Sequence, residues 1–130
     1  MPDLNSLSPD ECWSLLDEQQ FARIAWTSPS GPVVLPVNFT RDGEAVWVRT
    51  GAHSALAREA DESKVAVLVD DIDPVTHTGW TVLLRGTAHA EYHEERVPEA
   101  VRELVTWASG ARPIWLRLAP DTVSGRRMGG

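Results

Sequence analysis

The chain has 130 residues, a net charge of −7 at pH 7 and one cysteine. This length fits one domain with one hydrophobic core, and the single cysteine excludes an internal disulfide and a multi-cysteine metal site. The negative charge argues against nucleic-acid binding. Residues 1–10 do not resemble a signal peptide, and no apolar run approaches the roughly 18 residues of a membrane span. We therefore expect a cytoplasmic protein with no nucleic-acid or membrane partner.

The first half of the chain predicts a helix and then strands. Ser8, Pro9 and Glu11 have the spacing of a capping box, which predicts a helix that fades near Gln20. Residues typical of strands follow, and Pro36 among them favours a bulge or an unpaired edge. The expected strands cover residues 21–27, 33–40 and 45–50.

The second half predicts shorter helices between further strands. Ser54 can cap a short helix through Ala60, and the acidic run 70–73 before Pro74 is expected to end a strand. The remaining elements are strands over 64–69, 78–86, 87–93 and 114–118 and a helix over 98–108. Residues 1–6 and 126–130 are expected to fray. Strands joined by short turns favour a mainly β fold, an antiparallel barrel of six to seven strands with short helices.

Few residues have the pattern of a catalytic or metal site. His89 and His93 are four apart, but on a strand such residues lie roughly 13 Å from each other, which is too far for one ion. We therefore expect no metal site. His53 is the nearest thing to a general acid or base, and no catalytic residue is assigned.

A strand end followed by a helix start is the clearest candidate for binding an anion. Arg49 and Thr50 precede Gly51, and Ser54 opens the next helix, where unpaired amides favour phosphate. Such junctions are common, so the pattern alone is weak. Tryptophan is abundant, with six in the chain. Trp80 and Trp115 lie near strand starts, where a flat ring can meet a cofactor, although core packing is the default.

Several segments in this order together resemble one known family. They are Pro36–Phe39, Val46–Thr50, the run from Val69 to Gly86, and the ending Trp115–Pro120 with Ser124–Arg127. Over roughly residues 7–128 the chain resembles the pyridoxamine 5′-phosphate oxidase-related family of split barrels that bind flavin mononucleotide (FMN).

The resemblance implies one FMN-binding split-barrel domain over residues 1–130, a homodimer, and FMN at the interface between the subunits. In this family the residues matching Arg49, Thr50 and Ser54 surround the phosphate. The strand with Val37 and Asn38 lies along the flavin ring. The opposite subunit would supply Trp80, or the segment with Trp115 and Arg117.

Two departures from the family pattern bear on activity. Many relatives have a lysine in the loop that here reads Ser54-Ala55-Leu56, and the Arg-x-His substrate motif is absent because Arg117 is followed by Leu118 and Ala119. We therefore do not expect vitamin B6 oxidation. The leading hypothesis is an FMN-dependent oxidoreductase acting on a small planar molecule. The alternatives are a deazaflavin-dependent reductase, a non-catalytic flavin-binding protein and a cofactor-free barrel.

Overall fold

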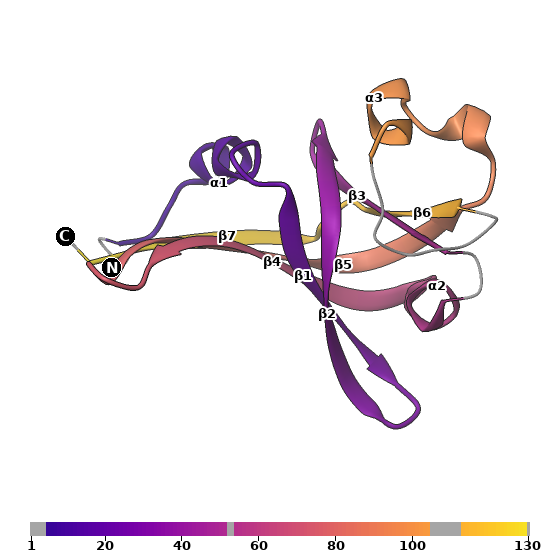
Figure 1. The fold of residues 1–130 in the computed structure, drawn as a ribbon, viewed down its shortest axis with the longest axis horizontal. Helices are drawn as coiled ribbons and strands as arrows, with labels where there is room; N and C mark the ends of the chain where they lie inside the picture. Colours follow the sequence, from indigo (N-terminus) through magenta and orange to yellow (C-terminus); the bar gives the residue numbers. More distant parts are fainter. Residues whose placement is uncertain (1–4, 52–53, 105–112, 130) are drawn as a thin grey trace.

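The computed structural model describes residues 5–51, 54–104 and 113–129, and its strands form one antiparallel sheet. In chain order the elements are α1 (Pro9–Leu16), β1 (Phe21–Ser28), β2 (Gly31–Asp42), β3 (Ala45–Gly51), α2 (Ala55–Ala60), β4 (Ser63–Asp73), β5 (Thr78–Glu91), the 3₁₀ turn η1 (Glu94–Arg96), α3 (Glu99–Arg102), β6 (Pro113–Leu118) and β7 (Thr122–Met128). The strand order is β4-β1-β2-β3-β6-β5-β7, and β4 also pairs with β5 (Figure 1). Six strands thus close into a barrel and β7 extends it, which confirms the expected fold class.

The first hairpins lie where the sequence placed them, and β2 has an open edge. It pairs with β1 from Gly31 to Asn38, but with β3 only from Phe39 to Asp42. Pro36 lies in the stretch whose only partner among the described strands is β1, as expected for a residue without a backbone N–H. The two strands therefore separate at Asn38.

The strand pair β4–β5 is longer than expected, and two predictions about it are wrong. The run 70–73 does not end the strand but pairs with residues 78–81. Only Asp73 makes the turn, where its Oδ1 accepts the N–H groups of Val75 and Thr76 at 2.8 and 3.3 Å. Residues 87–91 continue β5 instead of pairing back. Gly86 does not end the strand, because its missing Cβ makes room for the backbone of Pro120 and Asp121, each 3.0 Å from the position that Cβ would take.

The C-terminal tail was expected to fray from residue 126, and this is wrong for the described part of it. Residues 122–128 form β7 on the edge of β5, and Arg127 donates its backbone N–H to the carbonyl of Asn5 at 2.8 Å. Gly125 lies within this strand, and a Cβ there would lie 2.7 Å from the Sγ of Cys12. The glycine is a point of close packing between β7 and α1.

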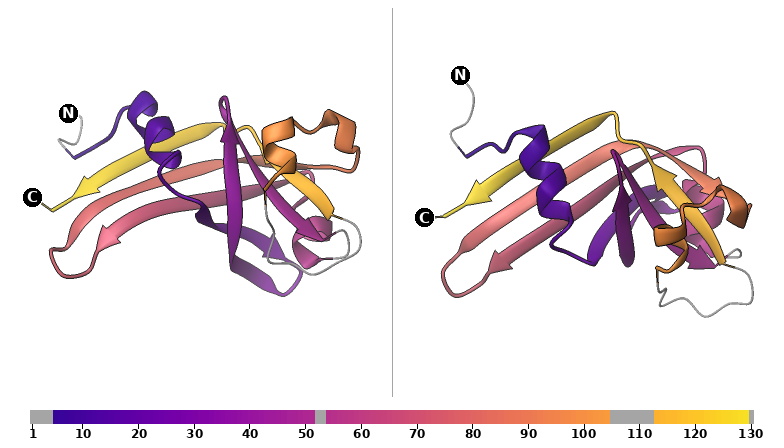
Figure 2. Two further views of the ribbon diagram at one scale, coloured as in Figure 1. Left: turned by 45° about the horizontal axis from the view of Figure 1, so that its top comes forward. Right: turned by 90° about the horizontal axis from the view of Figure 1, so that it is seen from above.

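The helices cap the barrel at three places. Ser8 and Glu11 make the predicted capping box at the start of α1, and the helix ends at Leu16, earlier than expected. Helix α1 lies across the strands β4, β5 and β7 (Figure 2). Helix α2 covers one barrel end, where the Nε1 of Trp26 donates to Glu59 at 2.9 Å. The helix expected over 98–108 is α3 in its described part, and residues 105–112 lie outside the described residues.

Side chains that point into the barrel and under α1 form the main core. Alternate residues of every barrel strand belong to it, together with the apolar side of α1. A second, smaller cluster lies on the outer face of β3 and β6, where α3 covers Trp47 and Trp115 with Val97 and Val101. Trp26 and Trp47 are 4% and 5% exposed, so the first is buried in the main core and the second in the smaller cluster.

Candidate functional site

Four of the predicted site residues flank the point where β2 and β3 separate. The last pair between the two strands near this point is Phe39 with Val48. If the register continued, Asn38 would face Arg49 and Val37 would face Thr50. The structure therefore brings these residues together at the open end of the β2–β3 pair, and we name this place the β2–β3 split.

The four residues divide between the two faces of the barrel wall. Val37 and Thr50 point inward and are 9% and 6% exposed, because successive residues of a strand alternate between faces. Asn38 and Arg49 point outward and are half-buried. A ligand at the outer face would therefore touch the side chains of Asn38 and Arg49, whereas Val37 supports the wall from within.

Asn38 presents an acceptor that lacks a partner. Its Oδ1 is buried, and no described residue donates a hydrogen bond to it. The side chain lines a cleft of about 370 Å³ between the outer face of β2 and helix α3. Other lining residues are Asp17, Gln19, Thr40, Glu103 and Leu104. A buried oxygen of this kind favours a ligand with an N–H or O–H group at this position.

Arg49 connects the barrel wall to the α3 segment. Its Nη1 donates to the carbonyl of Leu104 at 3.0 Å, and its guanidinium carbon lies 5.6 Å from the centroid of the Trp115 ring. A guanidinium at this distance over an indole makes a cation–π contact. Arg49 can bind an anion only in addition to these contacts or in exchange for them.

Thr50 and Ser54 form a hydroxyl pair at the end of β3. Their oxygens are 3.0 Å apart, and Ser54 Oγ also accepts the N–H of Ala57 as the cap of α2. One hydroxyl proton is used between the two residues, so one remains for a further acceptor. Residues 52 and 53 between them lie outside the described residues, and the candidate acid–base residue His53 is one of these two.

Trp115 and Arg117 lie beside Arg49 on the outer face of β6. Trp115 pairs with Arg49 across the two strands and Arg117 pairs with Trp47, so the two arginines are diagonal neighbours roughly 7–8 Å apart. Arg117 is exposed, whereas Trp115 is 3% exposed and packed beneath α3 of its own chain. Arg117 is thus open to a ligand on this face, while Trp115 is covered.

Trp80 lies far from the other candidates within one chain. It pairs with Asp71 and Arg127 near the start of β5 and belongs to the main core at 5% exposure. Trp115 pairs with Glu91 at the other end of the same strand, so the two tryptophans lie roughly 36 Å apart along β5. Within one chain, Trp80 therefore does not reach the β2–β3 split.

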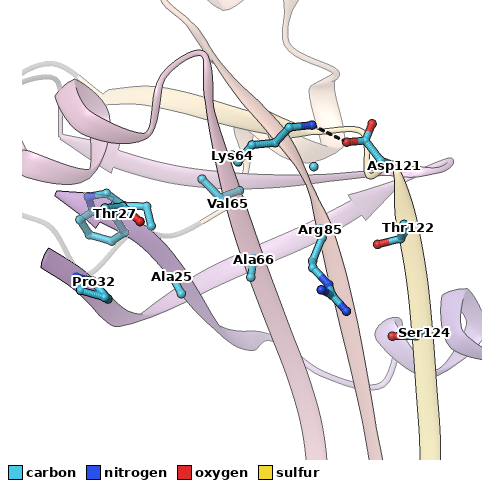
Figure 3. A pocket seen from close by; sticks show the side chains of 12 residues that line it. Ala25, Thr27, Pro32, Lys64, Val65, Ala66, Arg85, Asp121, Thr122 and Ser124 are labelled. Carbon is cyan, nitrogen blue, oxygen red and sulfur yellow. Dashed lines mark hydrogen bonds and ion pairs between the residues drawn. The ribbon is translucent and has the colours of Figure 1, made fainter.

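A larger hollow of about 590 Å³ lies on the outer face of β1, β4, β5 and β7 (Figure 3). Its floor is made of small side chains that include Ala25 and Ala66, and Arg85 reaches into it. Lys64 closes one side with an ion pair to Asp121 at 2.7 Å. None of the predicted site residues lines this hollow, which we name the outer groove.

Metal-ligating side chains do not cluster in the part of the chain that the structure describes. No group of three or more His, Cys, Asp or Glu side chains is placed to hold a metal ion within residues 5–51, 54–104 and 113–129. Burial raises the pKa of the Cys12 thiol, and Cys12 lies under β7, away from the split. In the same part of the chain, no helix has the length and apolar character that a membrane crossing requires.

Sequence reasoning missed the residues that α3 brings to the cleft. Glu103 and Leu104 face Asn38 and Thr40 across it, although more than sixty residues separate them in the chain. The sequence predicted a helix over 98–108 but carried no information about which strand that helix covers.

The sequence matches the family model described as pyridoxamine 5′-phosphate oxidase over residues 8–127. The chain belongs to the pyridoxamine 5′-phosphate oxidase family. The uncharacterized protein Rv0080 of Mycobacterium tuberculosis is 30% identical over an alignment of 127 positions, which covers 94% of this chain and 84% of that protein.

Solved structures of other proteins share the fold of this family member. The FAD binding protein from Mycobacterium smegmatis is 31% identical with a TM-score of 0.81, over 98% of this chain and 100% of its own. An FAD-binding protein from Mesorhizobium loti is 18% identical with a TM-score of 0.71, over 96% of each chain. At that identity, the second likeness supports the fold alone.

Proposed function

We propose that this chain is a flavin-dependent oxidoreductase that holds FMN, or the FMN half of FAD, at the β2–β3 split. The observation that carries the proposal is the set of Asn38, Arg49, Thr50 and Ser54 around this split in a chain of the pyridoxamine 5′-phosphate oxidase family. The likeness to an FAD binding protein, 31% identical over nearly the whole chain, supports a flavin as the cofactor.

The residues at the split fit the two ends of a flavin. The isoalloxazine ring carries an N–H group and several acceptors, and Asn38 offers a buried acceptor oxygen and an amide N–H₂ group. The phosphate needs positive charge and donors, which Arg49, Arg117 and one hydroxyl proton of the Thr50–Ser54 pair can supply. When bound, the flavin supplies the redox chemistry, and the chain binds and orients it and excludes water.

A second copy of the chain completes the site in this proposal. Outward-facing positions of β1, β4 and β5 carry half-buried apolar side chains at Ala25, Ala66, Leu68 and Leu83, and neighbouring Val34 is 59% exposed. The outward face of an antiparallel sheet is usually polar where water covers it. We expect this face to be the dimer interface, and the outer groove in Figure 3 is part of it.

Visible absorption of the purified chain, before and after addition of FMN or FAD and removal of free flavin, tests the cofactor. Shifted bands that remain on the protein support the proposal, and mass spectrometry of the released flavin distinguishes FMN from FAD. A chain that releases all flavin contradicts it. Reduction of the bound flavin by a nicotinamide cofactor, followed by turnover of an acceptor, separates an oxidoreductase from a flavin carrier.

Sedimentation of Leu68→Glu beside wild type tests the interface. Leu68 points outward between Arg23 of β1 and Leu83 of β5, so a glutamate there would place a charge that must lose its water in the apolar contact of the dimer, even with Arg23 opposite it. We expect a folded monomer that retains less flavin. Glu62→Gln, an exposed substitution just before β4, is the control. A dimeric Leu68→Glu variant would place the interface elsewhere.

A further inference from the structure

We propose that the cleft between β2 and α3 selects a planar substrate that carries a positive charge, and that Glu103 sets this preference. The inference rests on the proposed function, because the substrate must reach a flavin beside Asn38. It goes beyond the proposed function because it names the charge of the substrate and the residue that recognises this charge.

The charged groups that line the cleft are acidic. Asp17 and Glu103 are the two carboxylates, and neither lysine nor arginine is among the described residues that form its walls. Asp17 is neutralised from outside the cleft, because Nη1 of Arg41 lies 2.9 Å from its Oδ2. No described residue forms an ion pair with Glu103. Within the described residues, Glu103 therefore adds one negative charge, exposed and outside any ion pair, at the end of α3.

The neutral groups of the cleft favour a ligand that donates hydrogen bonds. Thr40 and Gln19 line the cleft, and their side-chain oxygens can accept hydrogen bonds, while the Oδ1 of Asn38 is taken by the flavin ring in the proposed complex. A ligand that carries N–H groups satisfies these acceptors, whereas a phosphate would face them and the Glu103 carboxylate without a cation. The volume of about 370 Å³ is within the range of pockets for small molecules.

Arg49, the cation bonded to Leu104 beside the cleft, does not change the negative sign of the charges that line it. Arg49 turns to the carbonyl of Leu104 and to the ring of Trp115, and it is not among the lining residues. In the proposed complex this guanidinium meets the flavin phosphate, so its charge is balanced by the cofactor. The substrate then meets Glu103 as the dominant charge.

The geometry therefore disfavours the molecule for which the family is named. Pyridoxamine 5′-phosphate carries a phosphate, and pyridoxamine is the same planar ring and amine without it. The two compounds are a matched pair of probes for the charge preference, whatever the natural substrate is.

Calorimetric titration of the flavin-loaded chain with each probe tests the inference. We expect pyridoxamine to bind at least about 5-fold more tightly than its phosphate. Glu103→Gln should reduce this ratio by about 3- to 5-fold, the effect of a partly exposed ion pair, and Glu103→Arg should reverse it. Glu99→Gln, on the same helix but outside the cleft lining, is the matched control and should leave the ratio unchanged. The preference should shrink at high salt, where exposed charges are screened.

Three results would overturn the inference: tighter or equal binding of the phosphate by wild type, a ratio that Glu103→Gln leaves unchanged, or no binding of either probe at millimolar concentration. The visible spectrum of the same sample reports flavin loading separately. A chain that takes up no flavin contradicts the proposed function, and the same titrations on the flavin-free chain still decide the charge preference of the cleft.

Discussion

Substitution of Arg49 by glutamine separates the structural role of this residue from its proposed role in flavin binding. In the chain without flavin, the guanidinium holds the α3 segment through the carbonyl of Leu104 and lies over the ring of Trp115. A hydrogen bond from a charged group contributes about 1.5–3 kcal/mol, and a half-exposed cation–π contact about 0.5–1 kcal/mol. Because glutamine keeps part of the polar contact, we expect Arg49→Gln to lower the free energy of unfolding by about 2 kcal/mol.

Urea denaturation of the flavin-free chain measures the expected loss in the free energy of unfolding of Arg49→Gln. Titration of the folded variant with FMN measures its flavin affinity, and we expect the affinity to fall by about 1.5–3 kcal/mol, or about 10- to 150-fold, with loss of the phosphate contact. Arg117→Gln, on the exposed part of the same face, should leave stability nearly unchanged. Wild-type stability in Arg49→Gln would refute the anchoring of α3, and wild-type FMN affinity would remove Arg49 from the flavin site.

Three further predictions concern the scaffold. Gly125→Ala places a methyl group 2.7 Å from the Sγ of Cys12 and should cost about 1–3 kcal/mol in urea denaturation; wild-type stability would mean that α1 moves away easily. Glu59→Ala leaves the buried indole N–H of Trp26 without its acceptor and should cost about 1–3 kcal/mol, whereas Glu59→Gln should cost less; equal losses would argue against this hydrogen bond. Two backbone N–H groups hold the pKa of Asp73 below its ordinary value. The carboxylate therefore stabilises the fold above the ordinary pKa, and this stabilisation is lost as the pH falls through the lower folded pKa. Asp73→Asn should flatten this part of the acid denaturation profile, and an unchanged profile would contradict this role of Asp73.

The parts of the fold that the sequence predicts correctly are those with local causes. The capping box at Ser8 starts α1, and Asp42-Gly43 marks the hairpin between β2 and β3, because these signals act between residues close in the chain. The errors arise where distant segments decide. Gly86 was expected to end a strand, and the residues after Gly125 were expected to fray. Both glycines instead lie where another segment packs closely against their backbone.

In the candidate site too, the features with local causes could be predicted from the sequence, and those that depend on distant segments could not. The hydroxyl pair of Thr50 and Ser54 is visible as a strand end followed by a helix cap, and the structure places it there. The place of Asn38 at the point where β2 leaves β3 depends on the pairing of these two strands, and only the family resemblance pointed to Asn38 as a site residue. Glu103 gave no signal, because the cleft exists only once α3 has packed over β2.

Binding of FMN to Asn38→Leu tests the central claim, that the flavin lies at the β2–β3 split, most directly. Leucine has a similar volume but offers neither the acceptor nor the donors of the amide, so we expect the dissociation constant to rise by about 5- to 30-fold, the effect of lost hydrogen bonds to a buried ring. Asn38→Asp keeps the acceptor oxygen and should bind more tightly than Asn38→Leu. Asn5→Leu alters the other asparagine of the chain, which is exposed and outside the site, and should bind as wild type does. Wild-type affinity in a folded Asn38→Leu variant would contradict the account and place the flavin elsewhere.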